Sequence, residues 1–193
     1  MPRGGGGGAR QPDLFGAALL PGLAYAEDRI DQAEEAALIA RIEGAGLAPF
    51  QYQRWEGKRL TRSFGWTYDF QTGRFAPGDP IPLWLEPLRA RAAAFAGLDA
   101  GALEQALLID YGEGAGIGWH KDRPVFGHVI GVSLGAPAKM RFRRRTGEGF
   151  ERATADLAPR SFYHMTGEVP DDWEHSIVPM SDCRWSVTFR SLR

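Results

Sequence analysis

The sequence predicts a domain built mainly of β-strands with two flanking helices, arranged as a double-sheet jelly roll (a double-stranded β-helix). Two segments with helical character come in the first half of the chain. A series of short alternating segments, separated by turn residues, fills the second half. Many short strands at this spacing, with two helices ahead of them, are typical of a two-sheet β architecture.

The length and composition fit one domain. A chain of 193 residues, 44% hydrophobic and 24% charged, can bury a single core. We expect residues 1–12, which contain a run of five glycines, to be disordered, and residues 13–193 to form the domain. The net charge is −1, so any attraction to nucleic acid has to be local. The single cysteine, Cys183, excludes an internal disulfide and cysteine-rich zinc sites.

The chain is expected to be a cytoplasmic monomer. An apolar stretch at residues 14–26 superficially resembles a signal peptide, but Asp13 at its start and Pro21-Gly22 in its middle argue against export. No apolar run approaches the length of a membrane span. A lone cysteine also fits a reducing compartment.

Two helices are expected ahead of most strands. Asp31 and Glu34 have the spacing of a capping box, which predicts a helix ending at about Ala45. A second helix is expected at about residues 83–95, and Pro87 favours a start at the proline itself.

Strands are expected where apolar and polar residues alternate. The stretch from Arg62 to Phe70 alternates in this way and predicts one strand with an aromatic face. Further strands are expected at residues 107–110, 119–122, 128–134, 139–145, 152–156, 160–165, 174–178 and 185–189.

A metal site is indicated by two histidines and an aspartate. His120 and Asp122 are two residues apart, so on a strand their side chains share a face. His175 follows 55 positions after His120. Two neutral imidazoles and one carboxylate, with the other positions open, suit a non-heme Fe(II) that binds oxygen. The same ligands also suit a zinc hydrolase.

The closing segment predicts a site for a small diacid. Arg184, Ser186 and Arg190 face one way, and three apolar residues face the other. The two arginine Cα atoms are roughly 20 Å apart at about 3.3 Å per residue, so the two cannot hold one carboxylate. Because guanidinium groups grip carboxylates with two parallel hydrogen bonds, a dicarboxylate lying along this strand is expected. A zinc site would leave these arginines without a purpose.

Together these motifs resemble the AlkB-like family of Fe(II)/2-oxoglutarate-dependent dioxygenases, in the family's order and over roughly residues 20–193. The resemblance implies the same jelly roll and a reaction that consumes 2-oxoglutarate and O2. The implied Fe(II) ligands are His120, Asp122 and His175, and the implied 2-oxoglutarate-binding residues are Tyr111, Arg184, Ser186 and Arg190. Ile109 is a departure, because the family often has Asn there, and one amide hydrogen bond to 2-oxoglutarate is lost.

The resemblance also implies N-alkylated bases of DNA or RNA as substrates. The candidate substrate-binding residues are Arg59, Arg62, Trp66 and Tyr68, in the stretch where the family carries a lid. Aromatic faces stack on bases and basic residues bind phosphates, although core packing and a solvated edge would explain them equally. Arg123 follows the HxD motif where DNA-repair members often place an acidic residue, which leaves tRNA or methylated protein open. A jelly-roll module that binds a metal or a small acid without turnover is a further alternative.

Three other features of the sequence lie outside these motifs. Residues 139–145 place three arginines on one strand face, which is either a solvated outer face or a phosphate-binding patch. His128 and His164 lack a partner at ligand spacing and are expected to be structural. Trp119, next to a candidate ligand, is expected to pack.

Overall fold

The computed structural model describes residues 20–52, 55–68 and 73–193. The predicted disorder of residues 1–12 and the predicted end of a strand at Phe70 lie outside this part. No helix in the described ranges is both long and apolar enough to cross a membrane.

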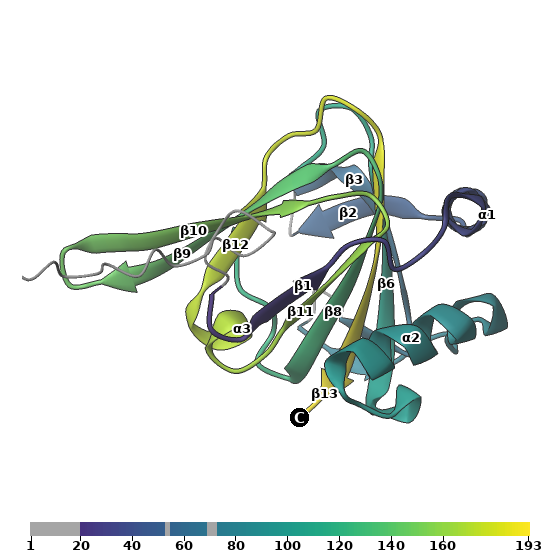
Figure 1. The fold of residues 1–193 in the computed structure, drawn as a ribbon, viewed down its shortest axis with the longest axis horizontal. Coiled ribbons are helices and arrows are strands. Elements are labelled where there is room, and N and C mark those ends of the chain that lie inside the picture. Colours follow the sequence, from purple (N-terminus) through teal and green to yellow (C-terminus); the bar gives the residue numbers. More distant parts are fainter. Residues whose placement is uncertain (1–19, 53–54, 69–72) are drawn as a thin grey trace, which may run out of the picture.

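Antiparallel strands dominate the fold (Figure 1), and the predicted mainly β jelly roll is confirmed. The strands are β1 (Leu23–Ala26), β2 (Ala48–Tyr52), β3 (Trp55–Phe64), β4 (Trp66–Tyr68), β5 (Phe75–Pro77), β6 (Leu103–Tyr111), β7 (Ile117–His120), β8 (Phe126–Gly135), β9 (Ala138–Thr146), β10 (Gly149–Leu157), β11 (Ser161–Met165), β12 (Glu174–Ile177) and β13 (Arg184–Leu192). The larger sheet has the order β1-β11-β8-β13-β6-β3-β2 and the smaller one β10-β9-β12-β7, while β4 and β5 form a separate pair.

Both predicted helices are present. Helix α1 (Gln32–Glu43) begins after Asp31, whose side chain accepts a hydrogen bond from the Glu34 backbone N–H at 2.8 Å, as the capping pattern predicts. Helix α2 (Glu86–Ala96) has Pro87 in its first turn and follows a short 3₁₀ turn, η1 (Leu83–Leu85). Two short helical elements, η2 (Ala100–Ala102) and α3 (Glu168–Asp172), and two strands, β2 and β5, were not predicted.

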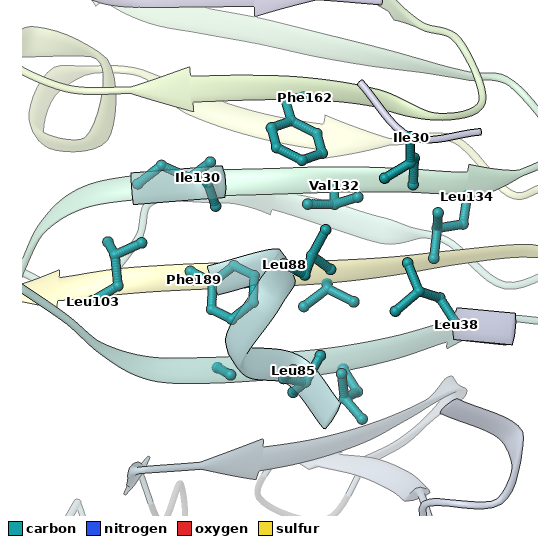
Figure 2. Packing of buried hydrophobic residues seen from close by; sticks show 14 of the residues in the cluster. Ile30, Leu38, Leu85, Leu88, Leu103, Ile130, Val132, Leu134, Phe162 and Phe189 are labelled. Atoms are coloured by element: carbon teal, nitrogen blue, oxygen red, sulfur yellow. The ribbon is translucent and has the colours of Figure 1, made fainter. Parts of the chain in front are cut away.

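The two helices cover the outer face of the larger sheet with an apolar core (Figure 2). Leu38 of α1 and Leu88 of α2 pack there with Val132, Phe162 and Phe189 from three strands. Each such side chain contributes about 1.5–3 kcal/mol when fully buried. Since successive residues of a strand face opposite ways, the alternate side chains of these strands point to the inner face, where polar residues such as Ser133 and Ser186 lie beside a second buried apolar cluster that includes Ile109 and Tyr163.

The single strand predicted from Arg62 to Phe70 is wrong, because the chain bends at Gly65. This glycine has φ = +77°, and a Cβ there would lie 2.0 Å from the carbonyl oxygen of Glu104. Only glycine tolerates both conditions. Phe64 therefore ends β3 inside the helix-side core, whereas Trp66 begins β4 and stacks on Phe75 of β5 with 4.9 Å between ring centroids.

Candidate metal and co-substrate site

Strands β7 and β12 bring the two candidate histidines together. His120 and His175 are directly opposite one another in the antiparallel pairing, and their ring centroids are 4.2 Å apart. Asp122 lies two residues beyond the end of β7, with its Oδ2 atom 3.6 Å from Nε2 of His175. The structure thus gathers all three predicted ligands.

Both imidazoles are in the form that binds metals. Nδ1 of His120 lies 2.9 Å from the carbonyl oxygen of Gly118. A carbonyl only accepts, so the proton is on Nδ1 and Nε2 keeps its lone pair. Burial lowers the pKa of His120, and burial together with the neighbouring His120 lowers the pKa of His175 to about 3. Both rings are therefore neutral at pH 7.

The Asp122 carboxylate is ionised but only half satisfied. Burial alone would raise its pKa, but the charge of Arg190, helped by the two histidines, more than offsets this and leaves the pKa below its ordinary value. Nε and Nη2 of Arg190 both lie 3.1 Å from Oδ1. The other oxygen, Oδ2, is buried without a hydrogen-bond partner in the described residues.

The residues fit a divalent metal ion, although the donors are not yet closed around one point. In the part of the chain that the structure describes, no three His, Cys, Asp or Glu side chains form a ready-made metal site. The donor chemistry is nevertheless suited to one, because the free oxygen of Asp122 faces the ring of His175 at a distance too long for a hydrogen bond. A buried anionic oxygen without a partner is costly, and a cation held with His120 would satisfy it.

Arg184 is the most unusual residue of the site. Its side chain is only 1% exposed, and its guanidinium carbon lies 4.8 Å from the centroid of the Tyr111 ring. Nε donates to Oγ of Ser133 at 3.3 Å, but neither Nη1 nor Nη2 has a partner in the described residues. A buried unpaired charge costs several kcal/mol, and two free nitrogens of one guanidinium match the two oxygens of a carboxylate.

Arg190 lies on the same face of β13 but is already engaged. Besides its contacts to Asp122, its Nη1 donates to Oε1 of Gln105 at 3.0 Å. The structure therefore places Arg190 against a candidate metal ligand, where it fixes the orientation of the carboxylate. Its predicted contact with the co-substrate stays a prediction.

The wall between the two arginines is partly apolar. Ser186 is paired with Ile109 across β13 and β6, and both are buried. Ser186 lies where a hydroxyl contact to a diacid was predicted. Ile109 supplies apolar surface where the resemblance suggested a hydrogen-bonding amide.

The two candidate arginines of β3 lie on opposite faces of the larger sheet. Leu60 is paired with Asp110, so Arg59 lies next to Tyr111, on the inner face. Arg59 is 8% exposed, and its Nε has no partner in the described residues. Burial lowers its pKa, and Tyr111 partly opposes this.

Arg62, in contrast, turns away from the site. Its Nη1 donates to the backbone carbonyl of Ala45 and its Nη2 pairs with Asp79 at 3.1 Å. Its neighbour across the strands, Leu108, belongs to the helix-side core. The predicted substrate role of Arg62 does not fit this position, and its contacts are structural.

The two candidate aromatic residues contact neighbours of the candidate metal ligand Asp122. Tyr68 receives the guanidinium of Arg123 on its ring at 3.9 Å, directly after Asp122 in the chain. Trp66 accepts a hydrogen bond on its carbonyl from Gln105, the residue that also holds Arg190. Tyr68 is thus placed at the rim, whereas the Trp66 ring packs on Phe75.

Tyr163 is a site residue that the sequence reasoning missed. It lies on β11 opposite Gly131, and a Cβ at Gly131 would come within 1.9 Å of its ring. The ring therefore crosses β8 toward β13, because only glycine leaves that space free. Burial raises its pKa to about 12, and the charges of Arg184 and Arg190 act on it in the opposite direction. The hydroxyl stays protonated and is available as a donor between the two arginines.

His128 and His164, which have no partner at ligand spacing in the sequence and are expected to be structural, pair with one another. Nδ1 of His128 lies 2.9 Å from Nε2 of His164. The neighbouring residues on β8 and β11 with the same orientation, Ile130 and Phe162, belong to the helix-side core. This pair therefore lies on the opposite face of the sheet from the candidate metal ligands.

The chain is similar to one known protein family and to several solved structures. The family model described as the 2OG-Fe(II) oxygenase superfamily matches residues 22–190. The solved structure of OsALKBH1 has a TM-score of 0.68 at 14% identity and covers 90% of this chain and 98% of its own. A prolyl-4-hydroxylase from Pseudomonas putida has a TM-score of 0.58 at 13% identity, with 89% and 93% covered. No curated protein sequence matches the chain. At these identities the two structures show a shared fold.

Proposed function

The chain belongs to the 2OG-Fe(II) oxygenase superfamily, and from this premise we propose that it removes N-linked alkyl groups from bases of DNA or RNA. Membership makes it a dioxygenase that uses Fe(II), 2-oxoglutarate and O2. It also favours iron over the zinc alternative and catalysis over a binding module without turnover. The AlkB-like resemblance is confirmed at the level of family and fold.

The chemistry divides between the bound groups and the chain. When bound, Fe(II), 2-oxoglutarate and O2 supply the oxidising power that hydroxylates a substrate C–H bond and yields succinate and carbon dioxide. An alkyl carbon hydroxylated next to a base nitrogen then leaves as an aldehyde. The residues of the chain orient the bound groups and exclude water from them. Arg184 is suited to hold the far carboxylate of the diacid, and Arg190 fixes the orientation of Asp122.

The single observation that carries the co-substrate assignment is the state of Arg184. A guanidinium buried to 1% exposure with two free nitrogens makes sense if an anion completes it. Three arginines, Arg59, Arg184 and Arg190, lie on the inner face of the larger sheet, and in the described residues only Arg190 pairs with a carboxylate, that of Asp122. This excess of positive charge supports a dianionic ligand between the sheets.

The rim of the site supports an anionic substrate. Arg123 lies on the Tyr68 ring directly after Asp122, and Arg59 lies inside beside Tyr111. A planar base can stack on an aromatic ring, and the phosphates on either side of it can pair with guanidinium groups. The basic residue after the HxD motif equally suits tRNA, whose phosphates offer the same charge.

Hydroxylation or demethylation of a protein is the second candidate. It is favoured by the fold shared with a prolyl-4-hydroxylase and by Arg123, which departs from the acidic residue of DNA-repair members. The two candidates share the iron and 2-oxoglutarate site and differ only in what enters at the rim.

Succinate formation with panels of substrates tests the proposal. The purified chain with Fe(II) and ascorbate is offered N-methylated DNA and RNA strands, tRNA, methylated peptides and proline-containing peptides. We expect succinate and formaldehyde to form in equal amounts with methylated nucleic acid, and Asp122→Asn to abolish both. Turnover with peptides alone would overturn the nucleic-acid proposal and favour the second candidate.

A further inference from the structure

A row of alternating guanidinium groups and aromatic rings crosses the outer face of the smaller sheet. We call it the arginine–aromatic ladder. It consists of Arg141, Trp119, Arg143, Phe150, Arg145 and Arg152. Arg141 and Arg143 lie 4.9 and 4.5 Å from the centroid of the Trp119 ring. Arg143, Arg145 and Arg152 lie 4.7, 5.8 and 5.5 Å from the centroid of the Phe150 ring.

The ladder runs from the back of the metal-binding strand to the end of a projecting hairpin. Trp119 is adjacent to His120 on β7, so the two side chains leave opposite faces of that strand. Phe150 is paired with Arg145 one step before the turn that joins β9 and β10. Figure 1 shows these two strands extending away from the body of the molecule. The ladder thus begins on the back of the metal-binding strand and ends at the tip of the hairpin.

The charge of the ladder is largely uncompensated. Of its four arginines, only Arg143 has a carboxylate partner in the described part of the chain, Glu174 at 2.6 Å. Neither Arg145 nor Arg152 is in an ion pair there. Lys139 and Asp156, further along the same face, pair with each other. A chain with a net charge of −1 therefore concentrates positive charge on this face.

The opposite face of the same hairpin shows the contrast. Arg144, the residue between Arg143 and Arg145, pairs with Glu151 at 2.7 Å and with Glu168 at 3.0 Å. Here the arginine is neutralised by carboxylates of the chain itself. The hairpin therefore has a neutral side and a basic side, and only the basic side carries Phe150, an aromatic residue that is 37% exposed.

We propose that the arginine–aromatic ladder binds a single-stranded stretch of nucleic acid that continues from the base held in the active site. The inference rests on the proposed function and extends it beyond the reacting base. Free guanidinium groups pair with phosphates, and the exposed Phe150 ring offers a stacking surface to a base. An acidic peptide would satisfy the charges but would leave the exposed ring without a use.

Binding can be measured apart from turnover. The probe is a fluorescein-labelled, unmethylated single strand of about 16 nucleotides, titrated with Mn(II)- and 2-oxoglutarate-loaded protein at several salt concentrations. Arg145→Ala and Arg144→Ala form a matched pair, since the residues are adjacent, have the same charge and lie on opposite faces. Thermal melting checks that each variant is folded.

The ladder predicts a distinct result for each variant. Arg145→Ala combined with Arg152→Ala should weaken binding about tenfold and lower the slope of log K against log salt by about 1.4, since each phosphate contact to a single strand contributes about 0.7. Phe150→Ala should weaken binding about tenfold with the slope unchanged. Arg144→Ala should bind like the unaltered chain.

Three outcomes would overturn the ladder: no binding of the strand, equal loss with Arg144→Ala and Arg145→Ala, or competition by polyglutamate as strong as by unlabelled strand with no effect of Phe150→Ala. The last outcome would indicate an acidic protein partner. Ladder-dependent binding without succinate from any methylated strand would support the ladder and overturn the proposed reaction.

Discussion

Arg184 and Arg190 lie at opposite ends of one face of β13, and their side chains are in opposite electrostatic situations. Arg190 contacts Asp122 through two nitrogens and Gln105 through the third. Arg184 is more deeply buried, yet in the described residues its two terminal nitrogens have no partner. Strand β13 therefore carries one arginine whose charge is paired within the chain and one whose charge is not.

The difference shows that some charged groups of a site are paired within the protein, whereas others are left for the ligand to pair with. A buried ion pair fixes its own geometry, so Arg190 belongs to the protein's permanent framework. A buried cation without a counter-charge costs folding free energy, and a ligand that binds only the folded state recovers it. The comparison predicts that the same substitution at the two positions has opposite effects on stability.

The largest effect is expected from Arg190→Met in the metal-free protein. The substitution leaves the Asp122 carboxylate buried without its partner, which should lower the free energy of unfolding by about 3–5 kcal/mol. Urea denaturation in the presence of a chelator measures this. Adding Asp122→Asn should restore most of the loss. A loss below about 1 kcal/mol would mean that Arg190 does not compensate a buried charge.

Unlike the two arginines, the histidine pair on the other face of the sheet should make the stability of the protein depend on pH. Burial, with the charge of His128, lowers the pKa of His164 to about 4. Its contribution to stability is therefore complete above about pH 6.5 and is lost as the pH falls toward 4. Between pH 7 and pH 5, the free energy of unfolding of the unaltered chain should fall by about 2 kcal/mol more than that of the His164→Gln variant. Equal losses of unfolding free energy in the unaltered chain and in His164→Gln would refute the lowered pKa of His164.

A smaller effect is expected at Tyr163, between the two arginines. Removing its protonated hydroxyl with Tyr163→Phe should raise the KM for 2-oxoglutarate about fivefold while the melting temperature stays nearly unchanged. Tyr25→Phe is the control, because its hydroxyl bonds to Glu27 and to the backbone of Ala158. If the KM does not move, Tyr163 has no role in holding the diacid.

The smallest effect, and the one opposite in sign to Arg190→Met, is expected from Arg184→Met without ligands. Replacing an unpaired buried cation by an apolar side chain should raise the free energy of unfolding by about 1 kcal/mol. The same urea titration measures it. A loss as large as that of Arg190→Met would show that Arg184 is already compensated within the chain.

Local pattern was enough to predict the parts of the site that lie on one strand. The alternation of residues 184–190 correctly placed Arg184, Ser186 and Arg190 on one face and Val187 and Phe189 in the core. The period of two could also have separated Arg59 from Arg62, because residues three apart on a strand face opposite ways. That signal was present in the sequence and was overlooked.

The remaining parts depend on how distant strands pair, which no local pattern reveals. Tyr163 reaches the site only because β11 pairs with β8 in the register that sets it over Gly131. His128 and His164 are partners through the same pairing. The bend at Gly65 likewise arises from its close approach to Glu104, 39 positions along the chain. Register is set by the packed sheet as a whole.

The most direct test is a calorimetric titration of 2-oxoglutarate into the anaerobic, Mn(II)-loaded chain and its Arg184→Met variant. We predict that one diacid binds per chain and that the variant binds it about a hundredfold more weakly while retaining Mn(II), because the buried guanidinium is the group that the far carboxylate satisfies. Equal affinity of the two proteins for 2-oxoglutarate would contradict the account.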